Sequence, residues 1–237
     1  MRKTGFSIIC VVLFVLSGCS EKTAKPLMSI PTTSTTVEGW NCGPGGVLDC
    51  VGADLRHTWL IGKNLNETDL SYANFSGNNL TRAYLDGANL TGANLTLADL
   101  TNTSIVSANL TGADLTGSFA TGTYWGYSNL TDANLTDAIL TDSSLHRAIL
   151  TRANFTRANL TGTTLSYLNM EDANLTDAIL TDADFRETNL TGANLTGANL
   201  TDAELTDAIL TGAILTGAIL TGANFTRAVM PDGTIHD

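Results

Sequence analysis

The feature that most constrains the fold is a five-residue period that runs from Leu55 to Met230. Every fifth residue is apolar, and all but Ala120 and Trp125 of these 36 residues are Leu, Ile, Phe or Met. Two residues before each stands Ala in 24 cases and Ser or Thr in nine, with Lys63, Asn78 and Leu168 as the exceptions, so that the unit reads A-[N/D]-L-T-[G/D]. A five-residue step rotates an α-helix by about 140°, and it puts successive leucines on opposite faces of a strand. Neither element can bury this pattern, and we expect a chain that turns a corner every five residues and stacks its turns as a solenoid.

The unit repeated over residues 51–230 is similar to that of the pentapeptide repeat family. The resemblance implies an all-β fold, a right-handed quadrilateral β-helix with four pentapeptides to a coil of 20 residues and about nine coils. The charged residues support a coil length of 20 residues, because that spacing stacks each of two arginines between two aspartates. Opposite charges on adjacent coils stabilise the stack. The predicted cross-coil charge ladder consists of Asp132, Arg152 and Asp172, and of Asp137, Arg157 and Asp177. The same spacing sets Arg147 between Tyr127 and Tyr167, where a guanidinium can lie on an aromatic face.

The repeat is disturbed in the stretch GSFATGTYWGYSNL, residues 117–130. Its inward residues include Trp125, which is too large for a slot that holds Leu elsewhere, since overpacking a core costs about 1–3 kcal/mol. We therefore predict a local bulge near residues 117–128 that exposes some of its aromatic side chains. The candidate partner-contact patch consists of Phe119, Tyr124, Trp125 and Tyr127. Such a patch is typical of a protein contact, and a tolerated repair of the repeat explains the same residues.

The N-terminus reads as an export signal and not as part of the fold. MRKTGFSIICVVLFVLSGC joins a basic start to an apolar run from Phe6 to Leu16, which is shorter than the roughly 20 residues that span a bilayer. Its ending, LSGC, resembles the lipobox of bacterial lipoproteins, which implies loss of residues 1–18 and a lipid on Cys19. A plain signal peptide cut nearby is the alternative. A lipid on Cys19 would anchor the protein to the bacterial membrane or cell surface, the outer membrane in a Gram-negative cell.

Two segments separate the lipid site from the repeats. Residues 19–37 carry Ser, Thr, Pro and charge without a period, which predicts a flexible tether. Residues 38–50 are expected to cap the first coil. Within them Cys42 and Cys50 flank an easily closed Gly-Pro-Gly-Gly loop, and we expect them to form a disulfide outside the reducing cytosol.

The C-terminal end leaves two possibilities open. Residues 231–237, PDGTIHD, are too short for a capping helix. An open β-helix end exposes unpaired backbone groups. Either this tail closes the last coil, or two copies of the chain pair end to end through it.

Charge and motifs exclude several classes of function. The chain carries a net charge of −11 and no cluster of Lys or Arg, so no nucleic-acid partner is expected. It contains no Gly-rich phosphate loop, no His/Cys ligand spacing and no nucleophile elbow. We therefore predict no catalytic residue, no cofactor or metal site, and no enzymatic activity.

The function predicted from these features is a membrane-anchored structural or protein-interaction module of the bacterial cell envelope, with an unknown partner. Two alternatives remain. An acidic rod of this family could mimic duplex DNA and bind a DNA-binding protein such as DNA gyrase, because 18 acidic and 8 basic residues lie in 51–230. A column of outward threonines at one-coil spacing could instead meet ice or another regular surface. That column is Thr81, Thr101, Thr121, Thr141, Thr161, Thr181, Thr201 and Thr221.

Overall fold

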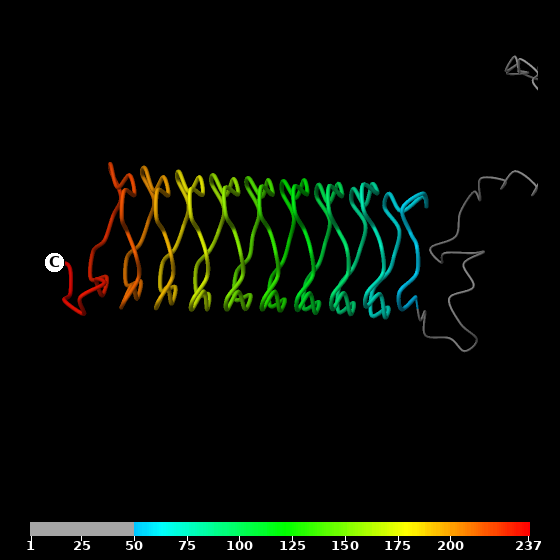
Figure 1. The fold of residues 1–237 in the computed structure, drawn as a ribbon, viewed down its shortest axis with the longest axis horizontal. Coiled ribbons are helices and arrows are strands. Elements are labelled where there is room, and N and C mark those ends of the chain that lie inside the picture. Colours follow the sequence, from blue (N-terminus) through cyan, green and yellow to red (C-terminus); the bar gives the residue numbers. More distant parts are fainter. Residues whose placement is uncertain (1–49) are drawn as a thin grey trace, which may run out of the picture. The chain divides into compact units, whose positions relative to one another are not determined.

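The structure is a computed structural model that describes residues 50–237. The predicted signal, Cys19, the tether and Cys42 lie outside the described residues. Within 50–237 each pentapeptide makes one side of a coil, with a two-residue turn followed by a three-residue extended segment. Successive coils lie side by side along the described part (Figure 1).

Parallel bridges join residues that are twenty apart, beginning with Asp54–Asn74 and ending with Ile209–Val229. The bridging residue is always the one before the inward Leu, so each side of a coil pairs with the same side of the next. Regular structure in 50–237 consists of these isolated bridges and of turns, with no helix and no longer strand assigned. The spacing confirms the predicted 20-residue register.

The two inward positions of the unit form one continuous core. Leucines such as Leu90 and Leu130 are fully buried, and so are alanines such as Ala93 and Ala98. Both positions face inward because a turn every five residues keeps the first and third residues of each extended segment on the same side of the chain. Burial of apolar surface at about 25 cal/mol per Å² therefore stabilises every coil along the stack.

The corners explain why the unit ends in Gly or Asp, a preference that the sequence reading left without a cause. The second turn residue has φ between +55° and +73° at every such position from Gly52 to Arg227 except His57. The turn closes with a hydrogen bond such as the Ala133 amide to the Leu130 carbonyl at 3.0 Å. Gly adopts positive φ without strain, and Asp and Asn tolerate it better than other residues.

The Asn and Thr of the unit connect one coil to the next. Asn134 Oδ1 accepts hydrogen bonds from the Thr136 amide at 3.2 Å and from its hydroxyl at 2.7 Å. In the next coil, Asn154 Nδ2 donates to Asn134 Oδ1 at 3.2 Å and to Thr136 Oγ1 at 2.9 Å. The N-L-T sequence thus satisfies polar groups at the surface.

A second polar column lies inside the core, where hydroxyls replace alanine in four consecutive coils. Thr123 Oγ1 donates to the Leu100 carbonyl at 2.7 Å, and Ser143 Oγ donates to the Ala120 carbonyl at 2.5 Å. The column consists of Thr103, Thr123, Ser143 and Thr163. Because buried hydroxyls need partners, these bonds to the preceding coil make the substitution tolerable.

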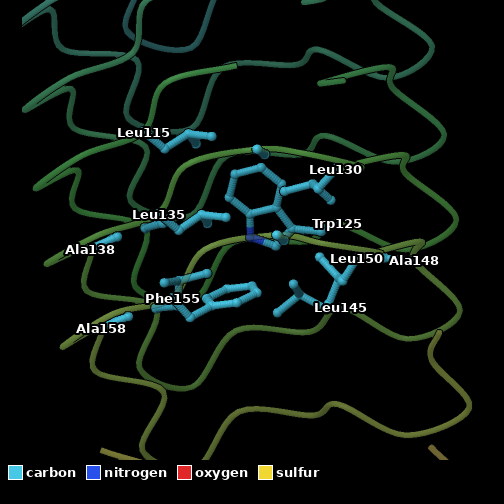
Figure 2. Close-up of a cluster of buried hydrophobic side chains, with 14 of the residues drawn as sticks. Leu115, Trp125, Leu130, Leu135, Ala138, Leu145, Ala148, Leu150, Phe155 and Ala158 are labelled. Atoms are coloured by element: carbon cyan, nitrogen blue, oxygen red, sulfur yellow. The ribbon is translucent and has the colours of Figure 1, made fainter. Parts of the chain in front are cut away.

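The predicted bulge near residues 117–128 is wrong, because the chain stays in register. Bridges Phe119–Ile139 and Tyr124–Ser144 continue the columns, and Trp125 points inward and is fully buried. Figure 2 shows its indole within a cluster of leucines and Phe155. We attribute the fit to Ala120, which stands at the preceding Leu position, since Ala in place of Leu provides volume for the larger ring.

The C-terminal tail folds back on the last coil. Ile235 forms an antiparallel bridge with Val229, and the Met230 amide donates to the Thr234 carbonyl at 2.7 Å. This strand covers only one part of the end. Ile214 and Ile219 remain 47% and 50% exposed.

Candidate functional site

The structure separates the four aromatic residues of the predicted partner-contact patch. Trp125 is buried and cannot contact a partner, which corrects that prediction. Phe119, Tyr124 and Tyr127 are 47%, 58% and 58% exposed. Phe119 and Tyr124 stand at the middle of two consecutive sides of the coil, and Tyr127 stands at the corner that follows Tyr124. Only Tyr124 and Tyr127 flank the same corner.

Tyr127 belongs to a cluster that continues through the next two coils. The His146 ring lies edge-on to Tyr127 at 6.5 Å and to Tyr167 at 5.5 Å between centroids. The Arg147 guanidinium lies 6.0 Å from the centre of the Tyr127 ring, as the 20-residue spacing predicted, and this is a cation–π distance. We call Tyr127, His146, Arg147 and Tyr167 the aromatic corner.

The backbone of the aromatic corner is strained for these side chains. Tyr127, Arg147 and Tyr167 have φ of 60°, 58° and 60°, a conformation that costs an L-residue about 1–2 kcal/mol relative to the right-handed one. Most other corners carry Thr followed by Gly, Asp or Arg. Here the pairs are Gly-Tyr, His-Arg and Ser-Tyr. Strain at bulky residues is often retained for function, which makes this corner the candidate functional site.

Tyr167, at the C-terminal end of the aromatic corner, interacts with the coil that follows it. A hydrogen bond to Glu187 raises the pKa of the Tyr167 hydroxyl. In the same coil as Glu187, Arg186 hydrogen-bonds Asp184, which lowers the pKa of that carboxyl. Both carboxylates nearest the corner on this side therefore have partners within the protein.

The charge ladder forms as pairs and not as triplets. Arg152 bonds Asp132 through two hydrogen bonds of 2.7 Å, and Arg157 bonds Asp137 at 2.7 and 2.6 Å. These bonds lower the pKa values of the two aspartates. Asp172 and Asp177, the other predicted members, act on the arginines only through the longer-range Coulomb interaction.

Three further ion pairs were not predicted from the sequence. Arg227 and Asp207 form a cross-coil pair of the same kind, and the 20-residue spacing was sufficient to predict it. The other two join neighbours within one pentapeptide side, Arg56 with Asp54 and Arg186 with Asp184. An exposed pair contributes about 0–1 kcal/mol, so these bonds tune the surface more than the stability.

Five of the eight threonines in the predicted column have hydroxyl contacts within the protein. Thr121 and Thr141 hydroxyls lie 3.1 Å apart. Thr161 and Thr201 donate their hydroxyl protons to the asparagine two residues earlier, at 2.7 and 2.6 Å. Their regular spacing is thus accounted for by the Asx turns of the repeat.

Residues 50–237 lack two other kinds of feature. No group of three or more His, Cys, Asp or Glu side chains in 50–237 is arranged to hold a metal ion. That part of the chain forms no helix of the length and apolarity needed to cross a bilayer. Cys50 is buried at the start of the first coil, and its predicted disulfide partner, Cys42, lies outside the described residues.

Comparison with known proteins identifies the repeat. The family model for pentapeptide repeats matches eight copies, in residues 49–77, 79–117 and, in overlapping segments, 128–230. A search of curated proteins finds no significant match.

Several solved structures are similar to the chain. HetL, a pentapeptide repeat protein involved in heterocyst differentiation regulation in the cyanobacterium Nostoc, is 33% identical over 73% of this chain and 87% of its own, with a TM-score of 0.44. QnrB1, a plasmid-mediated fluoroquinolone resistance protein, is 22% identical over 75% of this chain and 89% of its own, with a TM-score of 0.50. Because the family model matches most of the chain and HetL is 33% identical to it, the chain belongs to the pentapeptide repeat family, whose members form right-handed quadrilateral β-helices.

Proposed function

We propose that this protein is a non-enzymatic structural or protein-interaction module, held at a bacterial membrane by a lipid on Cys19. The observation that carries the proposal is the contact of two tyrosines, a histidine and an arginine with one another at one outer corner of a filled coil. Small-molecule sites are concave and lined by converging groups. Here the inward side chains fill the interior, so specific chemistry is available on the outer surface.

The finer features of the proposal rest on the N-terminal sequence. LSGC and the period-free residues 19–37 support a lipid anchor followed by a tether. Cys42 and Cys50 support a disulfide-closed cap on the first of about nine coils. Such a cap would cover the first open edge, as solenoids require at their ends.

The last coil supports a second copy of the chain as one partner. In earlier coils, amides at the inward and corner positions donate to the next coil, as Leu195 does to the Ile214 carbonyl at 2.8 Å. Among the described residues no acceptor stands opposite the corresponding amides of Leu215, Gly217, Leu220 and Gly222. Unpaired amides beside exposed isoleucines suit pairing with another chain.

The DNA-like alternative has weaker support. The solenoid is acidic, but Arg152, Arg157 and Arg227 each neutralise an aspartate on its surface. The structural likeness to QnrB1 at 22% identity concerns the fold alone. Full-length protein that leaves DNA supercoiling by gyrase unchanged at micromolar concentration would remove this alternative.

In vivo crosslinking of the full-length protein tests the proposed function. We expect reproducible protein crosslinks in the membrane fraction and loss of that fractionation in a Cys19→Ser variant. Crosslinks to no protein other than itself would limit the partner to a second copy. Absence of every crosslink, together with an unchanged location of Cys19→Ser, would contradict the proposal.

A further inference from the structure

The aromatic corner replaces both residues of the usual Thr-Gly or Thr-Asp pair in three consecutive coils, as Ser71-Tyr72 does in one coil elsewhere. The unit normally supplies Thr, whose hydroxyl bonds the preceding Asn or Asp, and then a residue that accepts positive φ. From Gly126 to Tyr167 the aromatic corner retains neither feature. Along this edge the sequence therefore gives up local hydrogen bonds and relaxed backbone, in favour of two tyrosines, a histidine and an arginine.

Arg147 differs from three of the four other arginines at the second corner position in 50–237, and the fourth, Arg82, also has no ion pair but is flanked one coil away by Gly62 and Asn102 and not by tyrosines. Arg152, Arg157 and Arg227 each form two hydrogen bonds with the aspartate one coil earlier. Arg147 has tyrosines one coil away on both sides, and its recorded contact is the face of Tyr127. No carboxylate in 50–237 bonds its guanidinium. Its fork of five donors is thus presented on an aromatic support and is available to an outside acceptor.

The surroundings of Arg147 favour an anion of small size. In its own coil and the two adjoining ones, the side positions that flank the corner carry no carboxylate. They are Tyr124, Ser144, Thr164, Asn129, Ile149 and Asn169. The next carboxylates, Asp184 and Glu187, are bonded to Arg186 and Tyr167. One positive charge on a strongly acidic solenoid suits a single carboxylate better than a polyanion, which the rest of the surface would repel.

The exposed neighbours of Arg147 indicate what accompanies that carboxylate. Tyr124 is 58% exposed on one side of the corner, and Ile149 is 44% exposed on the other. Tyrosine and arginine dominate the energetics of protein interfaces, and arginine binds carboxylates through paired hydrogen bonds. We propose that the aromatic corner is a docking site for a protein segment that presents an Asp or Glu to Arg147 and an apolar side chain beside it. This inference rests on the proposed interaction function and assigns it a surface and a class of partner.

The test is selection from a random peptide library displayed on phage against the immobilised full-length protein. Selected peptides are synthesised and titrated by fluorescence anisotropy. We expect them to contain Asp or Glu next to an apolar residue. We expect Arg147→Gly to weaken binding by at least about tenfold, the loss expected at an interface hot spot.

Arg152→Gly is the matched control, because Arg152 has the same side chain, a φ of 55° and a partner aspartate. It should bind the peptides like the wild type. Glycine suits both backbones, and circular dichroism checks that both variants fold. Replacing the peptide carboxylate with an amide should weaken binding as much as Arg147→Gly does.

Three outcomes overturn the inference: peptides that bind Arg147→Gly as well as wild type, peptides without acidic residues, or selection of no peptide. Preferential binding of duplex DNA or heparin at this corner would also overturn it. Crosslinked partners that survive Arg147→Gly would leave the proposed interaction function standing and reject only this surface. Absence of any partner in the crosslinking experiment would reject both.

Discussion

Two buried serines in neighbouring sides of the solenoid allow a direct test of how its polar core groups are tolerated. Ser118 and Ser143 both stand at the small inward position and are almost completely buried. Ser143 Oγ donates to the Ala120 carbonyl at 2.5 Å and accepts from the Thr123 amide at 3.2 Å. Ser118 Oγ has no hydrogen-bond partner. The same substitution, Ser to Ala, should therefore have opposite effects at the two sites.

The magnitudes follow from these contacts. Ser143→Ala removes two hydrogen bonds worth about 0.5–1.5 kcal/mol each, so we expect about 1–3 kcal/mol of destabilisation. Ser118→Ala removes a buried group whose unmet desolvation costs about 1–3 kcal/mol. Alanine fills the same position one coil away on both sides, at Ala98 and Ala138. We expect this variant to be more stable by about 1 kcal/mol.

Thermal unfolding of the full-length protein, followed by circular dichroism, measures both variants. One kcal/mol corresponds to about 2–4 °C for a protein of this size, so the two midpoints should move apart in opposite directions from wild type. Because both variants lose the same hydroxyl, effects on the unfolded chain cancel in the comparison. Equal destabilisation by Ser118→Ala and Ser143→Ala would refute the reasoning and show that Ser118 has a partner.

Three further predictions concern charge, backbone and packing. Hydrogen bonding from Arg56 lowers the pKa of Asp54 from 3.8 to about 2. The pair therefore stabilises the folded state above pH 3.8 and ceases to do so as the pH falls through about 2. The difference in melting temperature between wild type and Arg56→Gln should vanish over that window. Gly112 has φ of 64° and open space at its Cβ position, so Gly112→Ala should cost about 1–2 kcal/mol through the backbone alone, and a neutral result in urea denaturation would contradict this. Trp125→Leu should create a cavity that lowers the stability by about 2–4 kcal/mol, and Ala120→Leu should overpack the core and lower it by about 1–3 kcal/mol. The stability of the double variant should be close to that of the wild type. Additive losses of stability would reject the volume exchange between the two positions.

The periodic part of the fold followed from the sequence because one geometric constraint applies at every unit. A step of five with two inward residues leaves few ways to bury Leu and Ala. The register of twenty was also accessible, since opposite charges mark which residues stack. Arg152 and Arg157 do pair with Asp132 and Asp137. Each arginine forms an ion pair with one aspartate and not with two, because a single carboxylate satisfies the fork of the guanidinium.

The error at Trp125 arose because its size was weighed against a slot of fixed volume. The interior is shared among the four sides of a coil, so a large residue at one inward position can be offset by a small residue at the next. Ala120 was visible in the sequence as a second exception to the period, five residues earlier. Taken together the two exceptions keep the volume of the coil nearly constant, and the backbone has no reason to leave its register.

The role of the corner positions required the backbone dihedral angles. Sequence alone shows Tyr127, Arg147 and Tyr167 as departures from Gly or Asp, but so are Arg152 and Arg157. The structure separates these cases, because all five have positive φ and only the latter two gain an ion pair that offsets the strain. Tyr127 and Arg147 thus have positive φ without an ion pair, as Tyr72 does elsewhere, and what distinguishes the aromatic corner is that its rings and guanidinium contact one another across consecutive coils.

The family match has a gap inside the solenoid where the fold continues without interruption. Residues 118–127 fall between two matched segments, yet their bridges and turns continue those on both sides. A family match depends on the identity of residues at each position, whereas the coil depends on total inward volume and on backbone hydrogen bonds that any residue except Pro can make. A stretch that keeps these two properties can change its outer side chains without disturbing the stack. Consensus is then lost first where the surface has been altered, and the gap in the match leads directly to Tyr124 and Tyr127 at the edge of the aromatic corner.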